Sequence, residues 1–223
     1  MSKKIAILQA NTKIGKALVS EALKRGLDTT VIISNENETE ATQVIAKDTM
    51  DLTAEDLAAF DAVIDANAIW NDEYIARHYH TVMHVCDVLA NTNKQFLIVG
   101  GEGANISDNE ASKWYGTIEH TTKSNNNSVI TKWFGPGSMY EGYITGALAE
   151  YAEQIDDSLI NIDTLLASLK RRKDVNWIFM DPSCELDSNF VDIMLPYDGY
   201  AADMIDEIEY GVHYQQRVGT VCD

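Results

Sequence analysis

The chain has 223 residues, of which 45% are hydrophobic and 23% charged, proportions typical of a soluble globular α/β protein. Its formal net charge of −18 predicts an acidic surface that repels phosphate groups, which argues against nucleic acid and against an anionic membrane as partners. The three cysteines form no CxxC pair, and no apolar run is long enough for a signal peptide or a membrane span, so we expect free thiols and a cytoplasmic location.

The first 35 residues have the pattern of a strand, a tight turn, a helix and a second strand. Lys4–Leu8 and Thr29–Ile33 are short apolar runs with β-branched residues, as in buried strands. Between them, apolar residues recur at helical spacing up to Gly26, which is a typical helix stop. The turn at residues 9–15 retains only Gly15 of the three glycines that a dinucleotide-binding turn normally carries.

Strands and helices continue to alternate along the rest of the chain. The predicted elements are a weak strand at Thr42–Ala46, a short helix at Ala54–Ala59 with Thr53 as N-cap, strands at Ala62–Ala66, Gln95–Val99 and Val175–Met180, helices at Glu73–Ala90, Thr145–Leu169 and Tyr200–Tyr210, and a last strand at Arg217–Val221. This alternation predicts an α/β fold, a Rossmann-like doubly wound and mainly parallel sheet with helices on both faces. Residues 102–140 are rich in Asn, Ser, Thr and Gly, and Ser124–Ser128 is predicted to be an exposed tip.

Six segments carry a resemblance to one family, in the family's own order. They are Gln9–Gly15 at the position of G-A-T-G-x-x-G, Glu21–Asp28 at the end of the first helix, Lys47–Thr53, Leu97–Ala104, Trp177–Ser183 and Gly199–Glu209. With these segments the chain resembles the small bacterial NAD(P)-binding proteins of the atypical short-chain dehydrogenase superfamily, which include NmrA-like and NADH-flavin reductase-like proteins. The resemblance implies a single NAD(P)-binding domain over residues 1–223, with an irregular substrate-side region around 102–140 and 181–199.

The resemblance also implies where a dinucleotide would bind. The implied cofactor-binding residues are Gln9, Asn11, Thr12, Lys13, Ile14 and Gly15 at the turn, Ser34 and Asn35 at the ribose, Asp48 and Thr49 at the adenine, Asn67 at the nicotinamide ribose, and Gly100 and Gly101 beyond it. A helix N-terminus favours an anion, and Lys13 adds a positive charge. Ser34 stands where an arginine would face a 2′-phosphate, so NAD is favoured over NADP.

The resemblance predicts an NAD(P)H-dependent oxidoreductase that transfers hydride to a flavin-like or other small planar acceptor. No catalytic residue is assigned, because Ile155 stands where a lysine should follow Tyr151. A non-catalytic Rossmann-fold binding or sensor protein is the alternative, since Gln9 and Thr12 replace two glycines. We expect a small-molecule ligand as partner and no metal, although His80 and His84 share a helix face. A homodimer through the helix at 73–90 is a further hypothesis.

Overall fold

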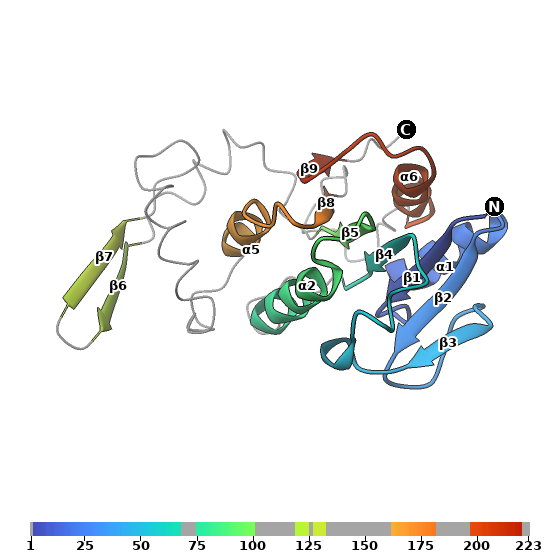
Figure 1. Ribbon diagram of the computed structural model, residues 1–223, viewed down its shortest axis with the longest axis horizontal. Helices are drawn as coiled ribbons and strands as arrows, with labels where there is room; N and C mark the ends of the chain where they lie inside the picture. The colour runs from blue at the N-terminus through green and yellow to red at the C-terminus, as the bar shows by residue number, and fades with distance from the viewer. Residues whose placement is uncertain are drawn as a thin grey trace, which may run out of the picture. The chain divides into compact units, whose positions relative to one another are not determined.

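The structure is a computed structural model that describes residues 2–67, 75–100, 119–124, 127–132, 162–181 and 197–219 (Figure 1). The chain divides into two compact units, one formed by residues 1–105 with 161–223 and the other by residues 106–160. The expected Thr145–Leu169 helix lies partly outside the described residues, and its last part is α5.

The first unit is built on a parallel sheet of seven strands in the order β3-β2-β1-β4-β5-β8-β9. Every neighbouring pair in this sheet is parallel. The strands are β1 (Lys4–Leu8), β2 (Asp28–Ile33), β3 (Gln43–Ala46), β4 (Ala62–Asp65), β5 (Gln95–Val99), β8 (Asn176–Asp181) and β9 (Gln216–Gly219). The sheet confirms the predicted Rossmann-like, doubly wound architecture. The central strands are near-continuous apolar runs because both faces of the sheet are covered.

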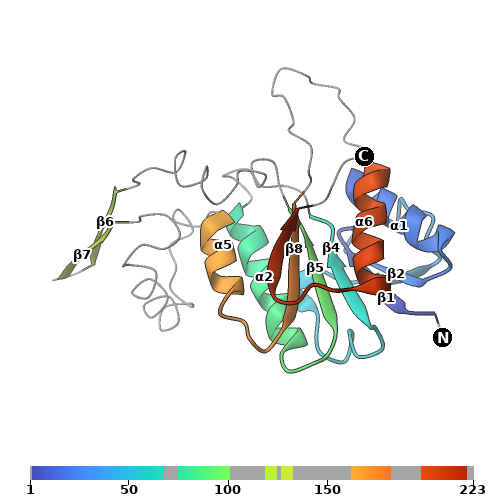
Figure 2. The same ribbon diagram turned by 90° about the horizontal axis from the view of Figure 1, so that it is seen from above.

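Helices cover the sheet in two pairs (Figure 2). Helices α1 (Lys13–Lys24) and α6 (Tyr197–Tyr210) pack against each other on one face, and α2 (Ile75–Leu89) and α5 (Ile162–Leu169) lie on the opposite face. A 3₁₀ turn, η1, spans Thr49–Asp51. The core under α1 and α6 includes Ile5, Ile7, Ile64, Leu97, Ile178, Leu18, Met204 and Ile208. Alternate strand residues point to the other face, as the period of two requires.

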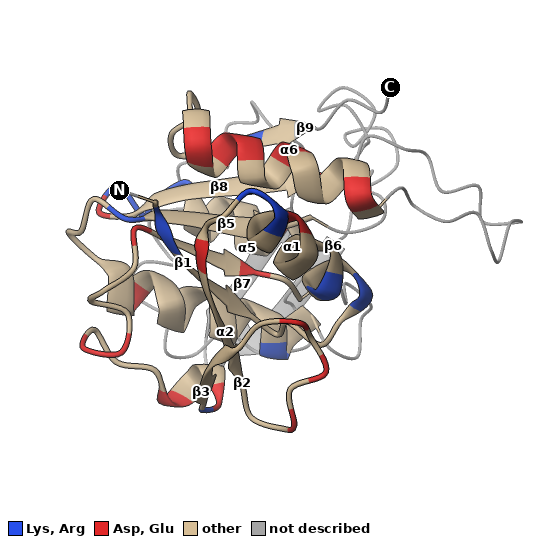
Figure 3. Cartoon of the chain, turned by 90° about the vertical axis from the view of Figure 1, so that its right-hand side faces the viewer, with Lys and Arg blue, Asp and Glu red and all other residues tan. Residues whose placement is uncertain are grey.

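Arg25, just beyond α1, joins α1 to α6. Its guanidinium lies 2.6 Å from a carboxylate oxygen of Glu21 and 3.0 Å from one of Glu209, and it also contacts Asp206. The aspartates and glutamates of α6 give the helix the acidic bands of Figure 3. The pKa of Arg25 is raised by these carboxylates, so its charge is fixed. One cation thus ties two helices that are far apart in the sequence.

Three cations near the amino-terminal ends of the strands bind backbone carbonyl groups. Lys94 donates to the carbonyls of Ala58, at 2.8 Å, and Phe60. Arg172 donates to the carbonyl of Cys86 at 2.8 Å near the end of α2, and Lys3 donates to that of Ile208 near the end of α6. The last carbonyls of a helix lack backbone partners, so Arg172 and Lys3 satisfy such groups at the ends of α2 and α6, whereas Lys94 binds carbonyls of a turn segment.

The predicted helix at Ala54–Ala59 is wrong, because this segment consists of turns. The capping signal itself is real: the backbone N–H of Thr53 donates to Asp56 Oδ2 at 2.8 Å, and the Thr53 hydroxyl donates to the same oxygen at 2.7 Å. Asp56 also pairs with Lys47 at 2.6 Å. Six residues are too few to repay the cost of helix nucleation, so the capping contacts close a turn instead.

The second unit contains an antiparallel hairpin, β6 (Glu119–Ser124) and β7 (Asn127–Lys132), in which Ser124 pairs with Asn127. The sequence predicts the turn region of this hairpin but not its strands. In the first unit, α6 begins three residues before the predicted Tyr200, and β9 begins at Gln216 instead of Arg217. Residues 73 and 74 of the predicted 73–90 helix lie outside the described residues.

Candidate functional site

The candidate site lies where the strand order reverses, between β1 and β4. In open α/β sheets, ligands bind outside the carboxyl ends of the strands at this switch point. The turn at residues 9–12 leaves β1 here and leads into α1, whose N-terminus faces the same edge. The site is therefore built from the ends of three elements: β1, β4 and α1.

Gln9 occupies the position of the first missing glycine, and its backbone has the conformation a glycine would normally supply. Its φ is 55°, in the left-handed region that L-residues rarely adopt. The turn is closed by the N–H of Thr12, which donates to the carbonyl of Gln9 at 3.2 Å. The path of the dinucleotide-binding turn is thus retained without its first glycine.

Thr12 replaces the second glycine and caps α1. Its hydroxyl accepts a hydrogen bond from the N–H of Gly15 at 3.0 Å and donates one to the carbonyl of Ala66 at 2.9 Å. The first contact is a helix N-cap. The second joins the turn to the chain just beyond β4, across the switch point.

The one retained glycine brings α1 against the turn. A Cβ on Gly15 would lie 2.6 Å from the carbonyl oxygen of Ala10. Ile14 is buried beside it, while Lys13 is exposed. Helix geometry leaves the N–H groups of Lys13 and Ile14 without intrahelical partners, and such groups at a helix N-terminus favour an anion.

Asn11 connects the turn to the loop after β2. Its side-chain amide donates to Asn35 Oδ1 at 3.2 Å and to the carbonyl of Glu36 at 2.8 Å. Its oxygen accepts the N–H of Glu38 at 3.0 Å, and the carboxylate of Glu38 lies 2.7 Å from Lys16 Nζ. The structure therefore brings together two of the predicted regions, the turn and the ribose loop, whose Ser34 is exposed.

Asp48 and Thr49 lie at η1, next in space to the turn. Asp48 accepts the N–H of Met50 at 2.9 Å, and its carboxylate lies 3.7 Å from Arg77 on α2. Thr49 is buried, and its hydroxyl accepts a hydrogen bond of 3.4 Å from the amide of Gln9. Thr49 is thus linked to the turn through Gln9, whereas the carboxylate of Asp48 faces α2.

Asp65, at the end of β4, forms a buried pair with His78 of α2 that the sequence does not predict. His78 Nε2 lies 2.9 Å from Asp65 Oδ2, and both side chains are 0% exposed. The other oxygen, Oδ1, accepts the N–H of the predicted site residue Asn67 at 3.1 Å. A carboxylate inside the apolar run Ala62–Ala66 was the sequence signal that could have indicated this pair.

Gly100, at the end of β5, is held by the neighbouring strand and by α6. Its N–H donates to the carbonyl of Met180 at 2.6 Å and lies 3.3 Å from the hydroxyl oxygen of Tyr200. A Cβ there would lie 2.5 Å from Asp181 Oδ1, so only glycine leaves room for that carboxylate. Asp181 also pairs with Arg217, and burial raises its pKa to about 7. The predicted site residue Gly101 lies outside the described residues.

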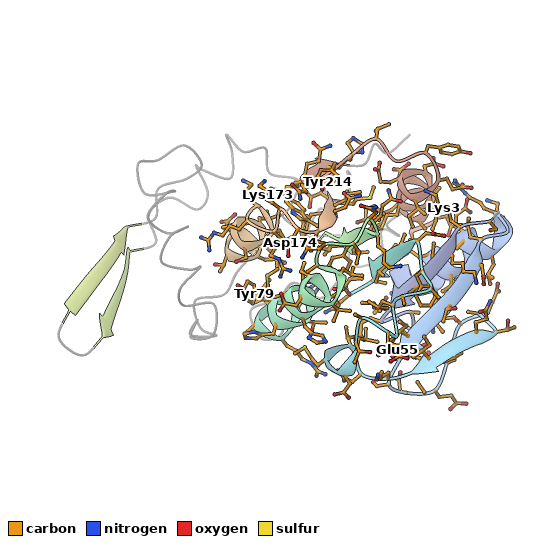
Figure 4. All side chains as sticks on the ribbon, in the orientation of Figure 1. Lys3, Glu55, Tyr79, Lys173, Asp174 and Tyr214 are labelled. Atoms are coloured by element: carbon orange, nitrogen blue, oxygen red, sulfur yellow. The ribbon has the colours of Figure 1, made fainter. Side chains whose placement is uncertain are left out.

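The homodimer through the helix at 73–90 stays a prediction, and Tyr79 of that helix lies against α5. Tyr79 is buried, and its hydroxyl lies 3.0 Å from that of Ser168 on α5 (Figure 4). His84 Nε2 lies 3.0 Å from the carbonyl of Leu52, and His80 packs edge-on against Tyr79.

The described residues contain no cluster of three or more His, Cys, Asp or Glu that could hold a metal ion. Among the helices described, none has the length and apolarity to cross a membrane.

Comparison with known proteins finds relatives over the whole chain, although no family model matches it. The chain is 26% identical to the uncharacterized protein YwnB of Bacillus subtilis (strain 168), with 99% of each sequence covered. It is also 26% identical to a Streptococcus pneumoniae TIGR4 protein described as a "putative NADH-flavin reductase", with a TM-score of 0.63 and complete coverage of both chains. A Bacteroides thetaiotaomicron protein described as a "putative epimerase" has the same fold, with 24% identity, a TM-score of 0.54 and coverage of 97% and 95%.

The fold, the turn at the switch point and the full-length similarity agree with the six sequence segments. The chain therefore has a Rossmann-like fold, and its full-length similarity to the Streptococcus pneumoniae protein is consistent with the resemblance to atypical short-chain dehydrogenase and NmrA-like proteins.

Proposed function

We propose that this protein is an NAD(P)H-dependent oxidoreductase that binds its dinucleotide across the switch point of the sheet. The observation that carries the proposal is the N-terminus of α1, which meets the carboxyl edge of β1 and β4 and carries the exposed Lys13. Two backbone N–H groups and a cation suit a pyrophosphate. The similarity to the Streptococcus pneumoniae protein supports a nicotinamide cofactor.

The predicted site residues can be assigned to successive parts of a dinucleotide lying along the carboxyl edge of the sheet. The pyrophosphate would lie on Lys13 and Ile14, the adenosine on Ser34, Asn35, Asp48 and Thr49, and the nicotinamide half near Asn67, Gly100 and Gly101. NAD is favoured over NADP because Lys16, near the ribose loop, is already paired with Glu38. A 2′-phosphate would therefore meet carboxylates in that loop.

The chemistry would be hydride transfer to a flavin or another small planar acceptor held beyond Gly100. The nicotinamide supplies the hydride when bound, and the protein orients the reactants and excludes water. This role requires no dedicated nucleophile. The edge at β5 and β8 is suited to it because Gly100 allows close packing of the strand ends.

Calorimetric titration with NADH and NADPH tests the proposal. We expect both to bind, NADH more tightly, and we expect Lys13→Ala to weaken both without changing thermal stability. The double variant Gln9→Gly with Thr12→Gly should bind more tightly, since glycine permits the close backbone approach that the Thr12 side chain hinders. Absence of binding of either nucleotide at millimolar concentration would overturn the oxidoreductase proposal.

A non-catalytic binding or sensor protein is the second candidate, and a specific observation favours it. Asn11 and Thr12 use their side chains to bond the protein itself, to Glu36, Glu38 and Ala66. The turn is thus stabilised in the absence of ligand. Following NADH absorbance with flavin mononucleotide or a quinone as acceptor separates the candidates: binding without oxidation of NADH assigns the sensor.

A further inference from the structure

The buried pair of Asp65 and His78 has a cost that folding alone does not explain. Both side chains are removed from water, and the two groups lie 2.9 Å apart. Desolvating a carboxylate and an imidazole consumes much of what their attraction returns, so apolar residues of similar volume often give equal or greater stability. A pair of this kind is best explained by what it holds in place.

The pair acts on the chain just where it leaves β4. One oxygen of Asp65 binds His78 on α2, and the other accepts the N–H of Asn67 at 3.1 Å. Between them, the carbonyl of Ala66 accepts the hydroxyl of Thr12 at 2.9 Å. Residues 65–67 are therefore held from two sides, by α2 and by the cap of α1, at the switch point of the sheet.

We infer that His78 and Asp65 are positioning residues, which fix Asn67 for the nicotinamide half of the ligand. This inference rests on the proposed function, since it assigns Asn67 to that half. His78 orients the carboxylate, the carboxylate orients the Asn67 backbone, and neither buried side chain needs to touch the ligand.

The hydrogen bond between Tyr79 and Ser168 provides a matched comparison on the same helix. It is also buried, with 3.0 Å between the hydroxyl oxygens, but it joins α2 to α5 and has no contact with residues 65–67 among the hydrogen bonds of the described residues. The test variant is Asp65→Leu with His78→Leu, which removes both polar groups together and so leaves no uncompensated buried charge. The control is Tyr79→Phe with Ser168→Ala, and His78→Gln retains an N–H donor for Asp65.

Amide hydrogen exchange in the ligand-free protein tests the positioning directly. We expect the Asn67 amide to exchange faster in the Leu double variant, to remain as in the parent in the control, and to be largely restored in His78→Gln. Exchange at Asn67 that is the same in parent and Leu double variant would overturn the inference. This measurement needs no ligand, so its outcome does not depend on whether the proposed function is correct.

Affinities for NADH and ADP then test what the positioning serves, because ADP lacks the nicotinamide half. We expect the Leu double variant to bind NADH about five- to tenfold more weakly, the effect of losing one oriented hydrogen-bonding group, and to bind ADP as the parent does. Equal weakening of both ligands would show a general structural effect and overturn the nicotinamide role. A parent that binds neither nucleotide would sink the proposed function and that role together, while amide exchange still decides whether the pair fixes Asn67.

Discussion

At the scale of single residues, the turn between β1 and α1 shows how side chains replace lost glycines. Gln9 adopts a φ of 55° at a cost that glycine would avoid, while Thr12 caps the helix and bonds to Ala66. Gly15 could not be replaced in this way, because the carbonyl of Ala10 fills the space of a Cβ. Residue 15 must have no side chain, and a polar contact elsewhere in the turn cannot create the space that a Cβ would need.

Gly15→Val should destabilise the fold whether or not a nucleotide binds. Its Cβ would lie 2.6 Å from backbone that cannot rotate away, so α1 must shift, at a cost of roughly 1 to 3 kcal/mol. Thermal melts with and without NADH measure the effect, and Lys13→Ala, an exposed position, is the control. A melting temperature equal to the parent's would contradict the close contact between α1 and the turn.

Gln9→Gly should leave stability unchanged or raise it slightly. Relief of the left-handed backbone gains roughly 1 to 2 kcal/mol, and the greater freedom of glycine in the unfolded chain returns about 0.5 to 1 kcal/mol of this. Gln9→Val, with a branched side chain, should do the opposite. Urea denaturation of the two variants is the measurement; destabilisation by glycine comparable to that by valine would argue against the strained conformation.

Local requirements of this kind could be predicted from the sequence, and distant pairings could not. Gly15 was identifiable because the motif fixes its place relative to the strand and the helix. Asp65 and His78 are 13 residues apart on different elements, and only the packing of α2 on β4 shows that they meet. Likewise the burial of Tyr79 depends on α5, which contacts it and is far along the chain.

At the scale of elements, one buried carboxyl group reinforces the contact between β5, β8 and β9. Asp181 ends β8, pairs with Arg217 of β9 and fills the space left by Gly100, the residue after β5. Tyr200 of α6 donates its hydroxyl hydrogen to the carbonyl of Met180, and burial raises the pKa of that tyrosine. An edge strand of four residues is held here by a side-chain pair in addition to its backbone ladder.

The raised pKa of Asp181 predicts that stability falls as pH rises from about 4 to 7. The group titrates near 3.8 when unfolded and near 7 when folded, so between these values the folded protein holds a proton that the unfolded chain has lost. The stabilisation is complete below the lower value and lost above the upper one. Urea denaturation at several pH values should show a flatter profile for Asp181→Asn than for the parent.

The exposed Asp198 provides the control for this profile, since Asp198→Asn alters the same charge in contact with water. It should leave the pH dependence close to that of the parent. Equal profiles for Asp181→Asn and the parent would show that Asp181 ionises in the folded protein as it does in the unfolded chain.

The type of an element could be predicted where a hydrophobic pattern extends over the whole segment. The prediction failed where it depended on a local signal. The apolar strands and the helices α1, α2 and α6 follow periods of 2 and 3.6 residues. The capping pair Thr53 and Asp56 predicted a helix that the six residues after it were too few to form. The hairpin of β6 and β7 was not predicted, because Glu119–Ser124 contains no apolar residue that could alternate with polar ones.

At the scale of the whole molecule, the charge of −18 opposes compactness while a few cations bind backbone carbonyls. Lys3, Lys94 and Arg172 are engaged at the amino-terminal edge of the sheet, and Arg25 holds α1 to α6. The remaining acidic side chains repel one another over distances that salt can screen. The balance between these two effects depends on ionic strength.

We expect the melting temperature to rise with sodium chloride concentration. Screening weakens the repulsion among the acidic residues, whereas exposed ion pairs such as Lys16 with Glu38 contribute little that salt could remove. Calorimetric scans from low to high salt measure the trend, with an uncharged osmolyte series to separate screening from solvent exclusion. A melting temperature that decreases with salt would indicate that the Arg25 contacts outweigh the repulsion.

The hydrogen bonds of Asn11 to the loop after β2 also predict how fast a nucleotide would bind under the proposed function. Because Asn35, Glu36 and Glu38 are already fastened to the turn, a nucleotide would meet a loop whose ordering entropy was lost during folding, not on encounter. The approach itself is then the slow part, since an anionic nucleotide must cross the field of an anionic protein. Its association rate constant should increase with ionic strength, the reverse of what electrostatic steering produces when protein and ligand carry opposite charges.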